Sequence, residues 1–197
     1  MGRPRQRTPE LRDRFIDETL KLLESSGLEA VTTRAVASAC ASSQAALHEL
    51  FGSKLGLIDA AALAGFGTLR DALHETQLPA DPKARVLALC RAHRDFSSGN
   101  PHLIALMYSR PFNDFSPDAA DLAVAAEILR LFTTEVSVLI KAERRSQQVT
   151  DTAVGLIALL VGLHHQDRSG TLGSTPATMQ RRWTAAINRY INSPNPT

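Results

Sequence analysis

Two short helical patterns that lie next to each other restrict the fold of this chain more than any other feature. The first covers residues 33–40 and the second residues 43–50, and only Ala41 and Ser42 separate them. Two helices of this length cannot bury enough apolar surface by themselves. A longer amphipathic pattern at 8–26, with Thr8 as a cap and Pro9 at its first helical position, supplies a third helix. The sequence therefore predicts a small three-helix unit near the N-terminus.

The remainder of the chain is also helical in pattern, and the alternation typical of strands is absent. Proline and glycine divide it into further helices, expected at about 53–74, 82–98, 102–109, 118–146, 150–168 and 175–192. We therefore predict an all-α protein of about nine helices, with one domain at 1–53 and a larger helical domain at 54–197. The helix that Ser53 caps runs across this boundary, so no flexible linker is expected there.

Composition restricts the class of protein. The chain has 197 residues, of which 44% are hydrophobic, and this is typical of a globular protein with a core. Its longest apolar stretch, 153–163, is too short to span a bilayer, and no signal peptide is recognised. Cys40 and Cys90 lie far apart in apolar helical patterns, without disulfide or metal spacing. We expect both to be reduced core residues of a cytoplasmic protein with no membrane partner, no metal and no cofactor.

The positive charge is concentrated at the N-terminus. Residues 1–14 carry a net charge of +3, whereas the whole chain carries only +2. A basic arm beside a folded unit is a common footprint of nucleic-acid binding. A solvated N-terminal tail explains the charge equally well. Arg3 and Arg5 flank Pro4, and such an arm can lie in a narrow minor groove.

The three N-terminal helices fit a helix-turn-helix, whose second short helix can lie in the major groove of DNA. On periodicity alone, an ordinary helical hairpin with a small polar face fits as well. The expected inward positions are Val31, Val36, Ala37, Cys40, Leu47, Leu50 and Phe51, and the outward positions are Ser43, Gln44, Ala45, Ala46, His48 and Glu49.

The residue identities favour the DNA-binding interpretation. Three segments resemble the TetR family of transcriptional regulators over about residues 9–60, with every spacing kept: Val31-Thr32-Thr33-Arg34-Ala35-Val36-Ala37, Ser43-Gln44-Ala45-Ala46-Leu47 and Phe51-Gly52-Ser53-Lys54. The chain departs from the family pattern where Ala41, Ser42, His48 and Leu50 replace the usual Gly, Val, Tyr and His. The resemblance implies a homodimeric repressor that a small apolar or amphipathic ligand releases from a palindromic operator in double-stranded DNA.

The resemblance also implies roles for single residues. Thr33 and Lys54, each at a helix start, would hold phosphates, and His48 can donate to another phosphate. Arg34 and Gln44 would read base edges, because Arg pairs with guanine and Gln with adenine. Ala45 would contact a thymine methyl, and Ser43 a base or a phosphate. The expected DNA-binding residues are therefore Thr33, Arg34, Ser43, Gln44, Ala45, His48, Lys54, Arg3 and Arg5.

By the same resemblance, the C-terminal domain binds a small-molecule effector and dimerises. An apolar set with a few polar members is expected to line the pocket, although each member is also explained as plain core: Phe66, His93, Phe96, Met107, Tyr108, Phe112, Phe132 and His164. Apolar stripes on the last two helices are expected at the dimer interface, with internal core as the alternative: Leu156, Leu160, Leu163, Met179, Trp183, Ile187 and Tyr190.

Two other functions compete with this one. The altered turn and recognition helix fit a helical interaction protein of the same fold that no longer binds DNA. An enzyme that uses the C-terminal domain is supported only by four isolated histidines, His93, His102, His164 and His165. No nucleophile and base are suitably spaced for catalysis. His164 and His165 are adjacent on a helix and point in different directions, so they form a poor chelate.

Overall fold

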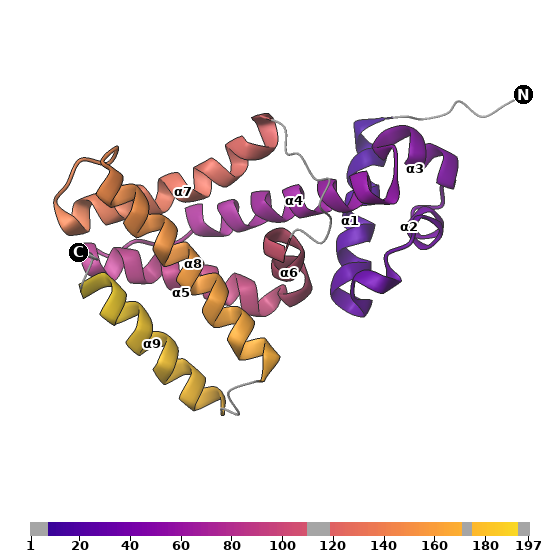
Figure 1. The fold of residues 1–197 in the computed structure, drawn as a ribbon. Coiled ribbons are helices and arrows are strands. Elements are labelled where there is room, and N and C mark those ends of the chain that lie inside the picture. The colour runs from indigo at the N-terminus through magenta and orange to yellow at the C-terminus, as the bar shows by residue number, and fades with distance from the viewer. Residues whose placement is uncertain (1–7, 110–118, 171–174, 193–197) are drawn as a thin grey trace, which may run out of the picture. The chain divides into compact units, whose positions relative to one another are not determined.

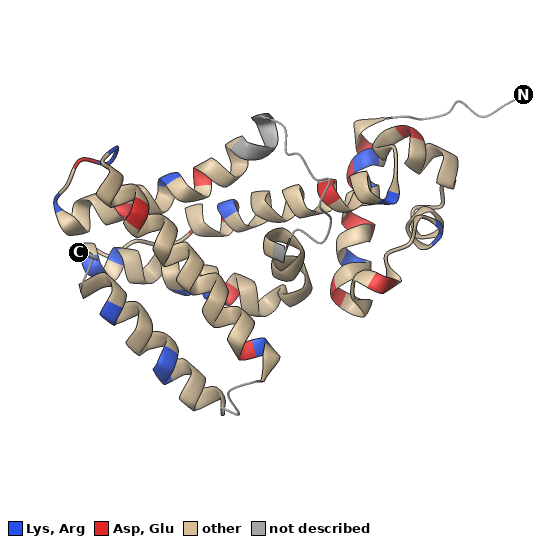
Figure 2. Ribbon diagram, viewed as in Figure 1, with Lys and Arg blue, Asp and Glu red and all other residues tan. Residues whose placement is uncertain are grey.

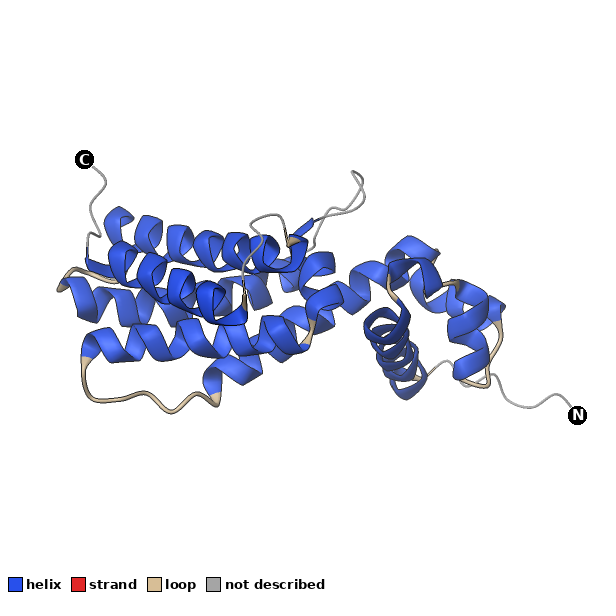
Figure 3. Ribbon diagram, turned by 90° about the horizontal axis from the view of Figure 1, so that it is seen from below, coloured by secondary structure: helices blue, strands red, loops and turns tan. Residues whose placement is uncertain are grey.

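The computed structural model describes residues 8–109, 119–170 and 175–192 (Figure 1). Every regular element in these ranges is helical (Figure 3), which confirms the all-α prediction. One 3₁₀ turn, at Leu28–Ala30, was not expected. The α-helices are α1 (Pro9–Ser26), α2 (Thr33–Ala39), α3 (Gln44–Phe51), α4 (Lys54–His74), α5 (Pro82–Gly99), α6 (Pro101–Ser109), α7 (Ala119–Ile140), α8 (Gln147–Ser169) and α9 (Pro176–Asn192).

Hydroxyl side chains cap the N-termini of the first four helices. A side-chain oxygen there accepts a hydrogen bond from a backbone N–H that has no partner within the helix. The predicted caps Thr8, Thr32 and Ser53 are confirmed, whereas Ser43 lies just before α3 as its cap rather than inside the helix. The bonds run from Leu11 N–H to Thr8 (3.4 Å), Ala35 N–H to Thr32 (3.1 Å), Ala46 N–H to Ser43 (3.1 Å) and Gly56 N–H to Ser53 (3.1 Å).

The helix expected at 118–146 ends earlier than predicted. α7 stops at Ile140, and Lys141 then adopts a left-handed φ of +54°. The N–H of Ala142 donates to the carbonyl of Ser137 at 3.1 Å, which closes the end of the helix. The prediction was wrong because a left-handed helix end normally carries Gly or Asn, and Lys gives no such signal.

The chain divides into two compact units by the density of its internal contacts. The described part of unit 1 comprises residues 8–67 and 100–109, and that of unit 2 comprises 68–99, 119–170 and 175–192. α4 is one continuous helix that contributes to both units. This division follows packing rather than function, and the predicted functional boundary between residues 53 and 54 stays a prediction.

Unit 1 is built on α1, which packs against α2 and α6, while α2 packs against α3. Phe15 of α1 is fully buried, and its ring meets that of Phe51 edge to face at 6.0 Å between centroids. At the other end of α1, the Glu24 carboxylate accepts a hydrogen bond from the N–H of Leu103 at 2.6 Å. This places a negative charge at the N-terminus of α6, where the helix dipole favours it.

The expected inward positions of the three-helix unit are largely confirmed. Val31, Val36, Ala37, Cys40 and Leu47 are buried, and Leu50 and Phe51 are half-buried. These side chains fill the space between α1 and the two short helices, so the opposite faces of α2 and α3 are free to carry polar residues.

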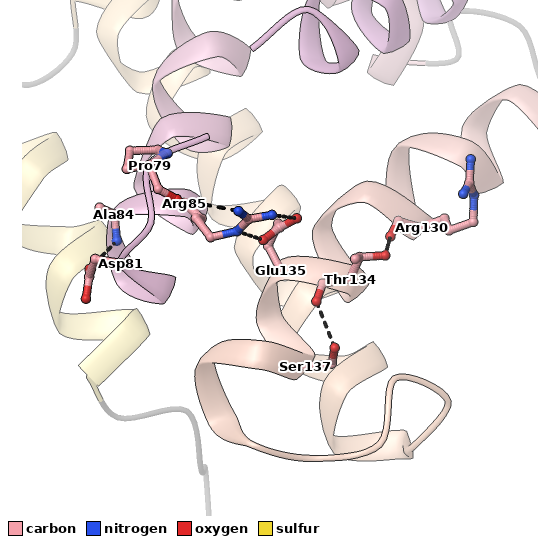
Figure 4. A network of polar contacts seen from close by, with 8 residues as sticks. All are labelled: Pro79, Asp81, Ala84, Arg85, Arg130, Thr134, Glu135 and Ser137. Atoms are coloured by element: carbon pink, nitrogen blue, oxygen red, sulfur yellow. Dashed lines mark hydrogen bonds and ion pairs between the residues drawn. The ribbon is translucent and has the colours of Figure 1, made fainter. Parts of the chain in front are cut away.

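In unit 2, α5, α7 and α8 pack against one another and α9 lies along α8 (Figure 1). A two-pronged ion pair joins α5 to α7 (Figure 4): Arg85 Nε lies 2.5 Å and Arg85 Nη2 3.0 Å from the two carboxylate oxygens of Glu135. Glu135 is 5% exposed, so its charge needs this partner. Asp81 accepts from the N–H of Ala84 at 2.8 Å and caps α5.

No single helix in the described ranges is both long and apolar enough to cross a membrane. The bent pair α3 and α4, with 66° between the two helices, meets the test only when both are taken together.

Candidate nucleic-acid interface

Most predicted contact residues of unit 1 that the structure describes lie at the solvent-facing starts of α2, α3 and α4, whereas His48 lies in the last turn of α3. Thr33 is half-buried, and the remaining six are exposed: Arg34, Ser43, Gln44, Ala45, His48 and Lys54. Arg3 and Arg5 lie outside the described residues. Acidic and basic residues interleave along the supporting helix α1, whereas α9 in unit 2 carries only basic ones (Figure 2).

The turn between α2 and α3 has a left-handed residue, and this residue is Ala41 rather than glycine. Ala41 has a φ of +48°, in the left-handed region. The N–H of Ser42 donates to the carbonyl of Ala37 at 2.9 Å, and the N–H of Ala41 to that of Ser38 at 3.0 Å. Together these bonds close the end of α2. The side chain of Ala41 makes this conformation costly, by roughly 1–2 kcal/mol.

Two arginines of α1 contact the short helices: Arg14 supports this turn, and Arg12 contacts the end of α3. In the sequence both count only toward the N-terminal charge. Arg14 Nη2 donates to the carbonyl of Cys40 at 2.7 Å, and Cys40 Sγ donates to the carbonyl of Arg14 at 3.4 Å. The cation therefore lies at the C-terminus of α2, where the helix dipole favours positive charge. Arg12 lies over the ring of Phe51, 5.3 Å from its centroid. No spacing in the sequence signals either contact.

Two of the expected DNA-contact residues contact each other. The Thr33 hydroxyl, at the start of α2, donates a hydrogen bond to Oε1 of Gln44, at the start of α3, at 3.0 Å. A hydroxyl has one proton, so while Thr33 donates to Gln44 it cannot donate to a phosphate. The two residues are eleven positions apart on different helices, and no pattern in the sequence signals this pair.

The junction of α3 and α4 fixes the positions of His48 and Lys54. His48 Nδ1 lies 3.3 Å from the carbonyl oxygen of Gly52, which ends α3 with a φ of +73°. A Cβ at Gly56 would lie 2.1 Å from the carbonyl oxygen of Phe51, so only glycine fits in this first turn of α4. Lys54, the first residue of α4, is exposed beside this tight junction.

The expected ligand-pocket residues divide between the two units. Phe66 of α4 and Tyr108 of α6 lie in unit 1 with their rings edge to face at 5.5 Å, and Met107 belongs to the same unit. Burial raises the pKa of Tyr108 to about 12. The members in unit 2 are His93, Phe96, Phe132 and His164. Phe112 lies outside the described residues.

Unit 2 contains a small open cleft, whose free volume of about 10 Å³ has room for about one water molecule. Of the expected pocket residues only His164 lines it, and its buried Nε2 has no hydrogen-bond partner among the described residues. The Arg94 guanidinium lies over the Trp183 ring, 5.0 Å from the centroid, and donates to Gln180. The full lining comprises Arg94, Ser98, Leu160, Leu163, His164, Asp167, Met179 and Trp183.

Most residues expected at the dimer interface are covered within one chain. Leu156, Leu160, Met179, Trp183 and Ile187 are buried, and Leu163 and Tyr190 are half-buried. The Tyr190 hydroxyl donates to the carbonyl of Thr152 at 3.3 Å and ties α9 to α8. Side chains that are already buried add little area to a contact with a second copy, so the structure assigns these positions first to the core of unit 2.

The two cysteines are buried and free, as predicted. Burial raises the pKa of Cys90 to about 12, so its thiolate is scarcely populated at neutral pH. In the part of the chain that the structure describes, no group of three or more His, Cys, Asp or Glu side chains is placed to hold a metal ion.

Comparison with protein families finds two matches. Residues 15–61 match the model described as bacterial regulatory proteins of the tetR family, and residues 86–190 match the tetracyclin repressor-like C-terminal domain. No curated protein matches the sequence.

Several solved structures share the fold. A protein of unknown function from Rhodococcus sp. RHA1 is 23% identical with a TM-score of 0.74, and the match covers 98% of both chains. The TetR family transcriptional regulator PfmR from Thermus thermophilus is 21% identical with a TM-score of 0.64, over 91% of this chain and 98% of its own. A TetR variant from Acinetobacter baumannii AYE, in complex with minocycline, is 17% identical with a TM-score of 0.65, over 91% of this chain and 93% of its own. At these identities the likeness is one of fold.

Proposed function

Because the chain belongs to the TetR family of bacterial regulatory proteins, we propose that it represses transcription as a homodimer on a palindromic DNA operator, and that a small apolar or amphipathic ligand releases it. The C-terminal match alone covers more than half of the chain. Members of this family are transcriptional regulators rather than enzymes, and they bind DNA and small ligands as dimers.

The observation that carries the proposal is the surface at the starts of α2, α3 and α4. The N-terminal residues of α3 are small or polar and exposed, as a recognition helix requires when it approaches base edges closely. Arg34 on α2 offers a two-pronged donor for guanine, and Lys54 offers a point charge for a phosphate. The tight junction at Gly56 holds Lys54 close to the end of α3.

The proposal is tested by gel shift and fluorescence anisotropy on the DNA that flanks the gene, with the salt concentration varied. Lys54→Ala should weaken binding to all sequences alike and reduce the slope of log K against log salt by about one unit, because one phosphate contact and its released counterion are lost. An unchanged affinity and slope would show that Lys54 holds no phosphate.

Lys21→Ala is the matched control, because this lysine of α1 is already paired with Glu18 at 2.7 Å. It should leave the salt slope unchanged. If the wild-type protein binds no genomic fragment at any salt concentration, the alternative of a helical interaction protein that does not bind DNA takes the place of this proposal.

The cleft of unit 2, which must widen to admit an effector, is the candidate effector site. Half of its lining residues are apolar, and its polar members include the Arg94 cation and the unsatisfied Nε2 of His164, which a polar ligand atom would satisfy. Trp183 is the single tryptophan of the chain and lines this cleft. Its fluorescence therefore reports directly whether a candidate effector that releases DNA binds in this cleft.

The exposed face of α8 supports the dimer. Val154 is 49% exposed, and Ala158 and Gly162 follow it at four-residue spacing on the same exposed face. Small apolar residues at this spacing let a second helix approach closely. In such a dimer the two α3 helices would face half-sites about 34–36 Å apart.

A further inference from the structure

We infer that Thr33 is a positioning residue for Gln44: its hydroxyl holds the Gln44 carbonyl toward α2, so that Gln44 turns its amide N–H donors to DNA and selects guanine rather than adenine. This inference rests on the proposed function, because it requires α3 to meet base edges in the major groove.

The geometry turns the Gln44 carbonyl toward α2. Oε1 accepts a hydrogen bond from the Thr33 hydroxyl, whose oxygen lies 3.0 Å away, and Thr33 is itself half-buried at the first position of α2. Thr33 follows the cap Thr32, whose side chain accepts from the N–H of Ala35 at 3.1 Å, so its backbone is held by the helix start. Gln44 similarly follows the cap Ser43. Both partners therefore extend from fixed backbone positions.

This orientation changes which base Gln44 can read. Pairing with adenine in the major groove requires the side chain to present its carbonyl to the N6 amino group and its amide to N7, both in the plane of the base. With Oε1 directed to Thr33, the amide N–H groups face the base alone, and the adenine amino group would meet them donor against donor. Guanine presents two acceptors, O6 and N7, and no donor on this edge. Gln44 in this state therefore matches guanine.

The experiment selects bound sequences from a randomised DNA library with four forms of the full-length protein. Gln44→Ala identifies the base pair that depends on Gln44, since its preference disappears there. Thr33→Ser keeps the hydroxyl and is the matched control, whereas Thr33→Val has nearly the same shape and cannot donate. Thermal melting of each variant verifies that it is folded.

The wild-type protein and Thr33→Ser should prefer guanine over adenine at the Gln44-dependent position by about tenfold, equivalent to about 1.4 kcal/mol. Thr33→Val should lose this preference or reverse it toward adenine, because the released carbonyl can accept from adenine. A phosphate contact by Thr33 would instead weaken all sequences equally and leave the base preference unchanged.

The inference is overturned if the wild-type protein prefers adenine at that position, or if Thr33→Val keeps the wild-type preference. Either result leaves the DNA-binding function itself intact. If the wild-type protein selects no sequence at all, the proposed function fails and this inference fails with it.

Discussion

Acidification should destabilise this protein through His93. The side chain lies on α5 with 1% of its surface exposed, and its Nδ1 is 3.3 Å from the Ser97 hydroxyl oxygen. Burial, and then the nearby His164 of α8, lower the pKa of His93 from its usual 6.5 to about 4. The folded protein thus keeps this imidazole neutral where an unfolded chain would protonate it.

The sign follows from the order of the two pKa values. Because the folded-state pKa is the lower one, the unfolded state takes up the proton first as the pH falls. The stability contribution of neutral His93 is complete above pH 6.5, is lost between pH 6.5 and about pH 4, and changes no further below that. The difference between the two pKa values corresponds to a loss of about 3 kcal/mol in the free energy of unfolding, at about 1.4 kcal/mol for each pKa unit. His164, whose pKa burial also lowers, adds a loss in the same direction.

The assay is urea unfolding of the wild-type protein and His93→Gln at fixed ionic strength between pH 7 and about pH 4. Glutamine keeps a polar side chain but does not titrate. Its own cost at pH 7 drops out, because the quantity compared is how the difference between the two proteins changes with pH. The wild-type free energy of unfolding should fall by about 3 kcal/mol more than that of the variant over this range.

His165→Gln is the control, because this histidine is exposed on α8 beside the half-buried His164. It leaves the buried His93 in place and should therefore keep most of the wild-type loss of stability on acidification. If His93→Gln also runs parallel to the wild-type protein, the buried imidazole does not carry the acid sensitivity and the reasoning from its burial is wrong.

Two further predictions concern the backbone of the turn and the ion pair of unit 2. Ala41→Gly should stabilise the protein by about 0.5–1 kcal/mol in thermal melting. Glycine removes the left-handed strain at φ +48°, and the larger entropy of its unfolded chain offsets only part of this gain. Ala35→Gly inside α2 is the control and should instead lower stability. Glu135→Gln should cost about 1–3 kcal/mol in urea unfolding at pH 7, since it weakens the charged hydrogen bonds from Arg85, and an unchanged midpoint would show that the pair contributes nothing.

Features that depend on a few neighbouring residues could be predicted from the sequence. A capping hydroxyl acts on a backbone N–H three residues away, so Thr8, Thr32 and Ser53 were recognisable before any tertiary contact was known. The end of α7 shows the limit of such local signals. Lys141 adopts a left-handed conformation that a glycine at this position would have indicated in the sequence. The predicted helix therefore ends six residues later than α7 does.

The candidate site was predictable as a set of positions but not as an arrangement. The spacing of the three segments placed Thr33, Gln44 and Lys54 at helix starts, and the structure confirms these places. The hydrogen bond between Thr33 and Gln44 depends on the path of the turn through Ala41, which propensity describes poorly. The support from Arg14 depends on how α1 crosses α2, and this is a property of packing rather than of pattern.

The residues predicted for the dimer interface and the pocket show that an apolar stripe in the sequence does not indicate whether the same chain or a partner buries it. Burying Leu156 or Trp183 against the same chain or against a second copy removes the same surface from water, so the periodicity is identical in both cases. Packing within one chain loses no translational entropy, whereas association of two chains does, so the most apolar stripe of a helix is buried within its own chain first. A second copy of the chain would then contact the neighbouring, less apolar face of the helix. On α8 that face contains Val154 and Ala158, which are not among the residues predicted for the dimer interface.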